Sequence, residues 1–152
     1  MQAAQTHKQK LIWIPFIAYL AFLIFVTLFT HNYYTYGRSS NFVIFSSIRL
    51  MLRSGSSVLI VKNIFGNVLL FLPLGFLMST IIPSKRRFGW QILFAFSIST
   101  LIEACQYFFA ARIFDIDDIL LNTAGSVLGF VIFLLLRFIK RKCVVLYVNG
   151  HR

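Results

Sequence analysis

The chain has 152 residues, of which 59% are hydrophobic, 17% aromatic and only 12% charged. A soluble domain carries roughly 25% charged residues to cover its surface, so this composition excludes a soluble enzyme, a disordered segment and a secreted disulfide scaffold. The formal net charge of +11 does not indicate nucleic-acid binding, because little polar sequence remains to build a basic groove in water. We therefore expect an all-α integral membrane protein surrounded by a lipid bilayer.

Four apolar runs are long enough to cross a bilayer as helices, which takes about 20 residues each. They lie at about 11–29, 64–82, 88–110 and 116–139. No small-residue cleavage site follows the first run, so we expect an uncleaved anchor rather than a signal peptide. The sequence predicts a four-helix transmembrane bundle.

The segment between the first two runs is too long for a simple turn, and its middle (41–57) is amphipathic. One interpretation is a helix lying in the outer membrane interface. The other is a lid in which Arg49 and Arg53 reach the acidic residues or an anionic ligand. We divide the chain into an anchor with an extracytoplasmic loop (1–62), a core of three helices (63–139) and a basic tail (140–152).

Basic residues are distributed unequally over the two sides of the predicted bundle. Ten of the fifteen Lys and Arg residues lie at the termini or in the 83–89 turn, and five lie on the other side. The positive-inside rule then predicts that both termini are cytoplasmic and that the acidic residues face outward.

All four acidic residues fall in one window of 16 residues, as Glu103, Asp115, Asp117 and Asp118. Glu103 lies inside an apolar run, where an acid costs a few kcal/mol and almost always faces a protein interior or a water-filled cavity. We expect a functional role for Glu103. The alternative is a purely structural pairing with Arg112 or Gln106.

Polar residues of three spans are predicted to meet near the outer helix ends. If the third and fourth spans form a hairpin that turns near Arg112, Glu103 lies level with Asn122, roughly 10 Å from those ends. Asn67 of the second span has a similar depth, and Asn63 lies one turn away on the same face. The sequence thus predicts an outward-facing polar site.

The run from Asp115 to Asn122 has three interpretations. It can cap and charge the start of the fourth helix. It can form a metal site, because Asp115, Asp118 and Asn122 share a face and offer the hard oxygen ligands that suit Mg²⁺ or Ca²⁺; in an enzyme, Asp115 and Asp118 would hold Mg²⁺ or Mn²⁺. It can also recognise a polar, amino-bearing or hydroxylated ligand. Without His or Cys in the cluster, a zinc hydrolase is disfavoured. We expect no cofactor unless the metal interpretation applies.

Small residues and a proline are predicted to shape helix packing. Gly125 and Gly129 form a small-xxx-small pair, which allows two membrane helices to approach closely. Pro73 and Gly75 interrupt the second span, which membrane helices tolerate when neighbours satisfy the freed backbone groups.

Three sequence blocks resemble the VanZ-like family of bacterial membrane proteins: GNVLLFLPLGF (66–76), STLIEACQYF (99–108) and RIFDIDDILLNTAGSVLGF (112–130). The resemblance runs from about Asn63 to Arg137. It implies a bacterial cytoplasmic-membrane protein that contributes to glycopeptide resistance of the teicoplanin type. The family pattern implies these binding residues: Asn67, Glu103, Gln106, Arg112, Asp115, Asp118 and Asn122.

Three functions are compatible with the sequence. The first is binding or shielding of a lipid-linked cell-wall precursor or a lipoglycopeptide at the outer leaflet. The second is a metal-dependent hydrolase or transferase acting on a lipid-linked substrate, with Glu103 as general base. The third is a structural partner that docks onto an envelope complex through Gly125 and Gly129.

Overall fold

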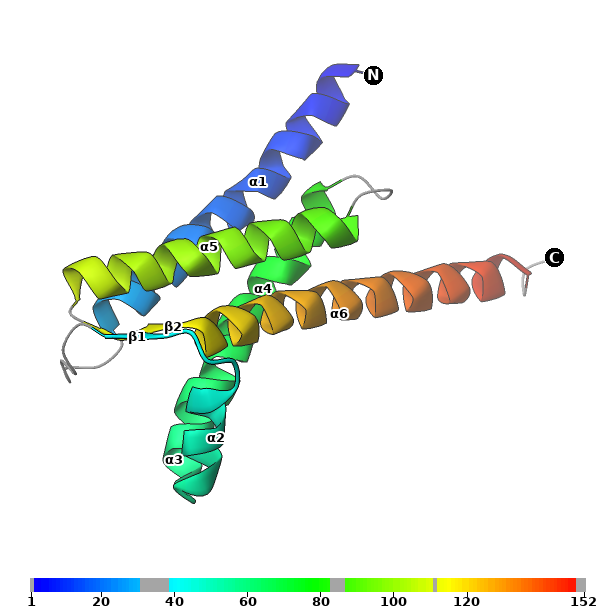
Figure 1. Cartoon of the computed structure of the whole chain (residues 1–152). Coiled ribbons are helices and arrows are strands. Elements are labelled where there is room, and N and C mark those ends of the chain that lie inside the picture. Colours follow the sequence, from blue (N-terminus) through cyan, green and yellow to red (C-terminus); the bar gives the residue numbers. More distant parts are fainter. Residues whose placement is uncertain (1, 31–38, 83–86, 111, 150–152) are drawn as a thin grey trace.

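The computed structural model describes residues 2–30, 39–82, 87–110 and 112–149. Their elements, in chain order, are α1 (Gln2–Phe25), the π-helical η1 (Val26–Thr30), β1 (Ser40–Asn41), α2 (Ser46–Arg53), α3 (Ser57–Leu59), the π-helical η2 (Ile60–Phe65), α4 (Gly66–Ile81), α5 (Arg87–Phe109), β2 (Phe114–Asp115) and α6 (Ile116–Asn149) (Figure 1).

Four helices within these ranges are long and apolar enough to cross a membrane. They cover Leu11–Phe29, Ser57–Ile81, Phe88–Phe109 and Ile116–Val144. The predicted all-α fold with four transmembrane helices is therefore confirmed, and the chain is a multi-pass membrane protein. The only strands in the described part of the chain are β1 and β2, which pair in parallel over two residues each.

Two spans differ from their predicted limits. The second begins at Ser57 rather than near Ile64, because the Ser56 hydroxyl caps the helix by accepting the N–H of Leu59 at 3.4 Å. The fourth helix continues to Asn149 instead of ending near 139. The basic residues after position 139 do not interrupt a helix, since neither Gly nor Pro occurs there before Gly150.

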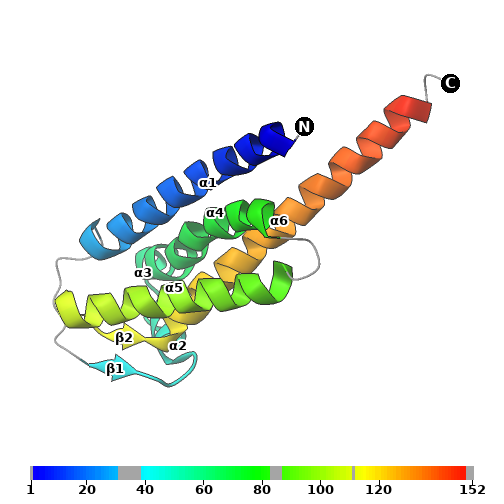
Figure 2. The same cartoon turned by 90° about the horizontal axis from the view of Figure 1, so that it is seen from above.

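The two ends of the bundle are formed by different elements. The starts of α1 and α5 and the ends of α4 and α6 lie at one end, and η1, the end of α5 and both strands lie at the other (Figures 1 and 2). Near this second end, α2 and α3 project sideways from the bundle (Figure 1). The interhelical turn between α5 and α6 thus lies beside β1, which precedes the projecting part.

Helices α4 and α6 pack backbone against backbone through three buried glycines, Gly75, Gly125 and Gly129. A Cβ atom added at any of them would overlap main-chain atoms of the opposite helix. Those atoms belong to Ser126 for Gly75, to Val68 for Gly125 and to Leu72 for Gly129. Gly125 and Gly129 therefore face α4 inside the bundle rather than an outer docking surface.

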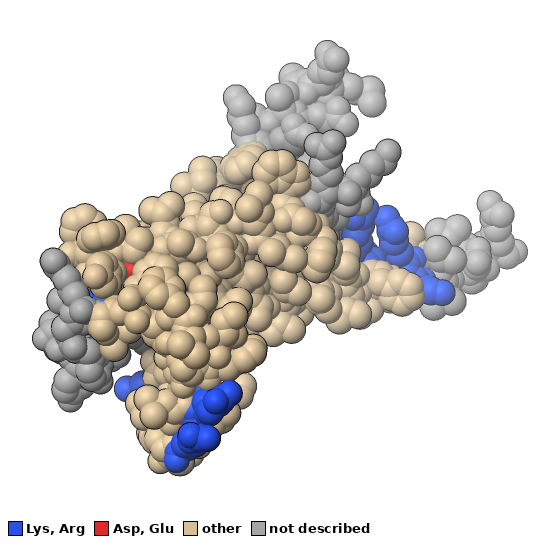
Figure 3. Space-filling view, viewed as in Figure 1, with Lys and Arg blue, Asp and Glu red and all other residues tan. Residues whose placement is uncertain are grey.

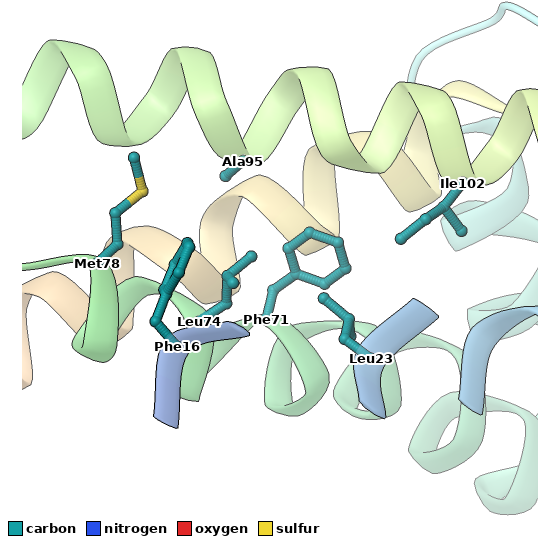
Figure 4. Packing of buried hydrophobic residues seen from close by; sticks show 7 residues of the cluster. All are labelled: Phe16, Leu23, Phe71, Leu74, Met78, Ala95 and Ile102. Carbon is teal, nitrogen blue, oxygen red and sulfur yellow. The ribbon is translucent and has the colours of Figure 1, made fainter. Parts of the chain in front are cut away.

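The apolar core joins α1, α4 and α5 (Figure 4). Its buried members are Phe16, Leu23, Phe71, Leu74, Met78, Ala95 and Ile102. A polar contact reinforces this packing, because the hydroxyl of Tyr19 in α1 donates to the carbonyl of Leu70 in α4 at 2.8 Å. The anchor helix is thereby fixed against the helix that also packs on α6.

A second buried contact fastens α5 to both α4 and α6. The amide of Gln91 is 1% exposed, and its Nε2 donates to the carbonyls of Gly75 at 2.6 Å and Ser126 at 3.1 Å. Its Oε1 accepts from the hydroxyl of Ser79 at 3.1 Å. Since a buried polar group in a membrane protein needs a partner, this fully bonded amide fixes the three helices relative to one another.

We expect Gly129→Ala to lower the melting temperature of the purified protein. In an open helix the change from Gly to Ala stabilises by about 0.5–1 kcal/mol. At Gly129 the new methyl group would collide with the backbone of Leu72, and overpacking of this kind costs about 1–3 kcal/mol. Gly89→Ala is the matched control, because a Cβ there meets nothing within 4 Å. Equal melting temperatures for the two variants would contradict the close packing.

Candidate functional site

A small polar cavity lies among α4, α5, α6 and the two π-helical segments. Its described lining is Thr27, Asn63, Asn67, Leu70, Ile102, Glu103, Gln106, Arg112, Asp118 and Asn122. The cavity volume is about 20 Å³, which accommodates roughly one water-sized group. Six of the seven residues expected to bind a ligand meet here, and Asp115 is the one that does not line the cavity.

Two carboxylates and one guanidinium dominate the charge of the cavity. Glu103 is 3% exposed, and its Oε2 accepts the backbone N–H of Asp115 at 3.2 Å. Asp118 accepts from Nδ2 of Asn67 at 2.6 Å through Oδ1. Arg112 lines the same cavity and attracts both carboxylates. The hydrogen bond to Glu103 thus comes from a backbone amide that the sequence did not suggest.

The side-chain amides around the cavity direct their nitrogens toward the protein. Nε2 of Gln106 donates to the carbonyl of Thr27 at 2.8 Å, and Nδ2 of Asn122 donates to the Ser99 hydroxyl at 2.8 Å. Nδ2 of Asn63 donates to the carbonyl of Leu59 at 3.0 Å. One N–H of each amide is bonded in this way, and the second N–H and the oxygen of each amide are further hydrogen-bonding groups.

Two buried polar atoms of the site have no hydrogen-bond partner among the described residues. They are Oε1 of Gln106 and Nη1 of Arg112. Gln106 is only 4% exposed, so bulk water has little access to it. A buried unsatisfied polar group costs about 1–3 kcal/mol, and such exceptions in native proteins call for a ligand, a water or a catalytic role.

Both π-helical segments contribute to the cavity. Thr27 belongs to η1 and Asn63 to η2. A π-helical turn inserts an extra residue into the helix, which re-aims side chains and leaves the backbone less regular, and such turns often occur at functional sites. The carbonyl of Thr27 is accordingly free to accept from Gln106 across the helix interface.

Asp117 has a different role from its neighbour Asp118. Its carboxylate is 0% exposed and accepts three backbone N–H groups at the start of α2. The donors are Phe45 at 2.6 Å, Ser47 at 2.9 Å and Ile48 at 3.3 Å. Phe45 adopts φ 65°, a left-handed conformation that is unusual for a bulky residue and turns the chain into the helix. Asp117 therefore caps α2 from another part of the sequence.

Asp115 joins β1, α2 and α6. Its Oδ1 accepts from Nδ2 of Asn41 at 3.1 Å and from the N–H of Asp117 at 2.9 Å, which caps α6 as the sequence suggested. Its Oδ2 accepts from the hydroxyl of Ser47. In the metal interpretation Asp115 and Asp118 would face one ion, whereas in the structure the carboxylate of Asp115 bonds Asn41 of β1 and Ser47 of α2. Within residues 2–30, 39–82, 87–110 and 112–149, no three His, Cys, Asp or Glu side chains form a metal-binding group.

A family model described as VanZ/LLP1 matches residues 16–137, which is most of the chain. The chain belongs to the VanZ/LLP1 family. Every described residue that lines the polar cavity falls inside the matched region. No curated protein and no solved structure was found to match the chain.

Several residues of this VanZ/LLP1 site could not be singled out from the sequence. Thr27 at the cavity and Asn41 and Ser47 at the α2 junction are single polar residues without a spacing signal. The amphipathic segment between the first two spans becomes helical only from Ser46, so Phe42 and Phe45, which are more than half exposed, precede α2. Hydrogen bonds at its N-terminus hold α2 in place, and no residue of α2 is buried.

We expect Asp117→Asn to release α2 of the VanZ/LLP1 protein while leaving the bundle intact. One oxygen becomes an NH₂ group that faces backbone N–H donors, and losing hydrogen bonds to a charged group costs about 1.5–3 kcal/mol. Hydrogen exchange of the 45–53 amides should accelerate about 10- to 100-fold. Asp118→Asn is the matched control, since Asp118 bonds Asn67 instead of α2. Unchanged exchange in Asp117→Asn would refute the capping role.

Proposed function

We propose that this protein binds the polar head of an amphiphilic envelope molecule at the outer leaflet and thereby contributes to glycopeptide resistance of the teicoplanin type. The ligand class is a lipid-linked cell-wall precursor or a lipoglycopeptide. The observation that supports the proposal is the cavity in which Oε1 of Gln106 and Nη1 of Arg112 are buried without partners among the described residues. A ligand group that bonds both atoms would remove the cost of leaving them unsatisfied.

An amphiphilic ligand is favoured because an apolar pocket lies at the same end of the bundle as the polar site. The pocket has a volume of about 320 Å³ and is lined by Ser40, Phe42, Ala104, Tyr107, Phe108 and Phe114. It lies on a different face of α5 from the cavity, because Ala104, Tyr107 and Phe108 line the pocket and other α5 residues line the cavity. We propose that the lipid chain of the ligand occupies this pocket while its polar head binds in the cavity. A ligand without a lipid chain would lose that apolar contact, which is the physical basis for discriminating teicoplanin from vancomycin.

The proposal places the cavity at the outer side of a bacterial cytoplasmic membrane, with both termini in the cytoplasm. Basic side chains gather toward the end of α6, and others lie at the foot of the α2–α3 projection, while the acids are almost hidden (Figure 3). We expect a C-terminal reporter that is active only in the cytoplasm to be active, and the same reporter inserted after Ser54 to be inactive. The reverse pattern would contradict the outward orientation.

The function is tested by drug susceptibility in a Gram-positive host that lacks this protein. Wild type at a matched membrane level should raise the inhibitory concentration of teicoplanin at least fourfold and that of vancomycin less than twofold. Glu103→Gln and Asp118→Asn should each abolish the protection, because each replaces a carboxyl group of the cavity by an amide of nearly the same size. Inhibitory concentrations and membrane levels are measured in the same cultures.

Leu101→Ile is the matched control, since Leu101 is on the same helix as Glu103 but 61% exposed. It should protect as well as wild type does. Equal protection against both drugs would contradict a contact with the lipid chain. Full protection by Glu103→Gln and Asp118→Asn would show that the polar cavity is not needed for the function.

A further inference from the structure

The polar cavity has one more acidic than basic side chain among its described lining residues. Glu103 and Asp118 are set against Arg112. Glu103 and Asp118 lie in membrane-spanning helices and Arg112 lies in the connection between two of them, and an uncompensated charge buried there is costly and is normally paired. With both carboxylates ionised, the charge that complements this lining is a single positive one.

The hydrogen-bonding groups of the cavity point to a donor as ligand. Asn63, Asn67, Gln106 and Asn122 each direct a side-chain N–H to a protein acceptor. Their oxygens and the two carboxylates are acceptors, and Oε1 of Gln106 is buried with no donor among the described residues. Nη1 of Arg112 is a buried donor without a partner among the described residues, and an oxygen atom of the ligand next to the bound group can accept from it.

The size of the cavity limits what enters it. A volume of about 20 Å³ holds roughly one non-hydrogen atom of the size of a water oxygen. A primary ammonium group meets this limit and offers three N–H donors. A quaternary ammonium or an N-acetylated amine does not fit, and the acetylated group is also uncharged.

We propose that the cavity binds the protonated primary amine of its ligand, so that the site is specific for amine-bearing amphiphiles. The inference rests on the proposed function and narrows its ligand class. Glu103 and Asp118 supply the opposite charge, and the amide oxygen of Gln106 accepts one of the N–H groups. The same amine chemistry can be supplied by a lipid-linked wall precursor or by an acylated glycopeptide.

The first experiment uses the protein in lipid nanodiscs and two pairs of probes. One pair is an undecaprenyl-linked disaccharide pentapeptide with a free or an acetylated lysine amine, and the other is an acylated glycopeptide with free or acetylated amines. Wild type should bind the free-amine form of at least one pair more than tenfold more tightly than the acetylated form. Glu103→Gln and Asp118→Asn should weaken free-amine binding at least tenfold and leave acetylated binding unchanged. Leu101→Ile should behave as wild type.

The outcomes separate this inference from the proposed function. Equal affinity for free and acetylated forms would overturn the amine site while leaving amphiphile binding intact. If neither pair binds in either form, the proposed function and the inference both fail. The pair that shows the amine effect identifies the source of the amine.

The second experiment tests the cavity without an amphiphile. Methylammonium chloride should raise the melting temperature of wild type by about 2 °C relative to sodium chloride at the same concentration, since a ligand stabilises the state that binds it. Tetramethylammonium chloride should not, because it exceeds the cavity. Glu103→Gln should lose the methylammonium effect and retain its cooperative melting. Identical shifts with all three salts would overturn the amine site.

Discussion

The backbone contact between α4 and α6 is the constraint on which the rest of the structure depends. Three glycines remove the side chains that would separate the two helices, and lipid offers no hydrophobic force that would substitute for such packing. Because α4 and α6 touch along this seam, Asn67 and Asp118 come within hydrogen-bonding distance, and Gln91 of α5 reaches carbonyls of both helices. The cavity is the space left on the same seam, toward the end where the π-helical segments replace regular helix. A wider separation of α4 and α6 would abolish both the cavity and the hydrogen bonds of Gln91.

The three aspartates at and just before the start of α6 have different roles, because each faces a different direction. Asp117 bonds the start of α2 and Asp115 bonds Ser47, so both hold the segment of β1 and α2 in place. Asp118 lines the cavity inside the bundle. The segment of β1 and α2 is nevertheless coupled to the cavity, because the backbone N–H of Asp115 donates to Glu103. A displacement of β1 and α2 would disturb that N–H, so this segment positions a carboxyl group that it does not touch.

Much of this arrangement could be predicted from the sequence, for physical reasons that can be named. Span positions follow from apolar length, and the meeting of Asn67, Glu103 and Asn122 follows from helical rise and from the cost of polar groups in lipid. The role of Asp117 could not be predicted, since its partners are backbone N–H groups about 70 positions earlier, which have no side-chain signature. The start of the second span at Ser57 was missed because Lys62 and Asn63 lower the apolarity of a segment that a serine cap and a π-helical turn keep helical.

Two buried polar clusters of this bundle, the one around Gln91 and the one that lines the cavity, differ in how completely their hydrogen bonds are satisfied. Both atoms of the Gln91 amide have partners in their cluster, and the single hydrogen of the Ser79 hydroxyl is shared between Oε1 of Gln91 and the carbonyl of Gly75. Such a cluster holds helices together and leaves nothing for a ligand to add. The polar cavity has the same kinds of residue, yet Gln106 and Arg112 each retain an atom without a partner in the described part of the chain. In lipid the cost of that difference is not relieved by bulk water, and for this reason we propose the cavity, rather than the Gln91 cluster, as the place where a ligand binds.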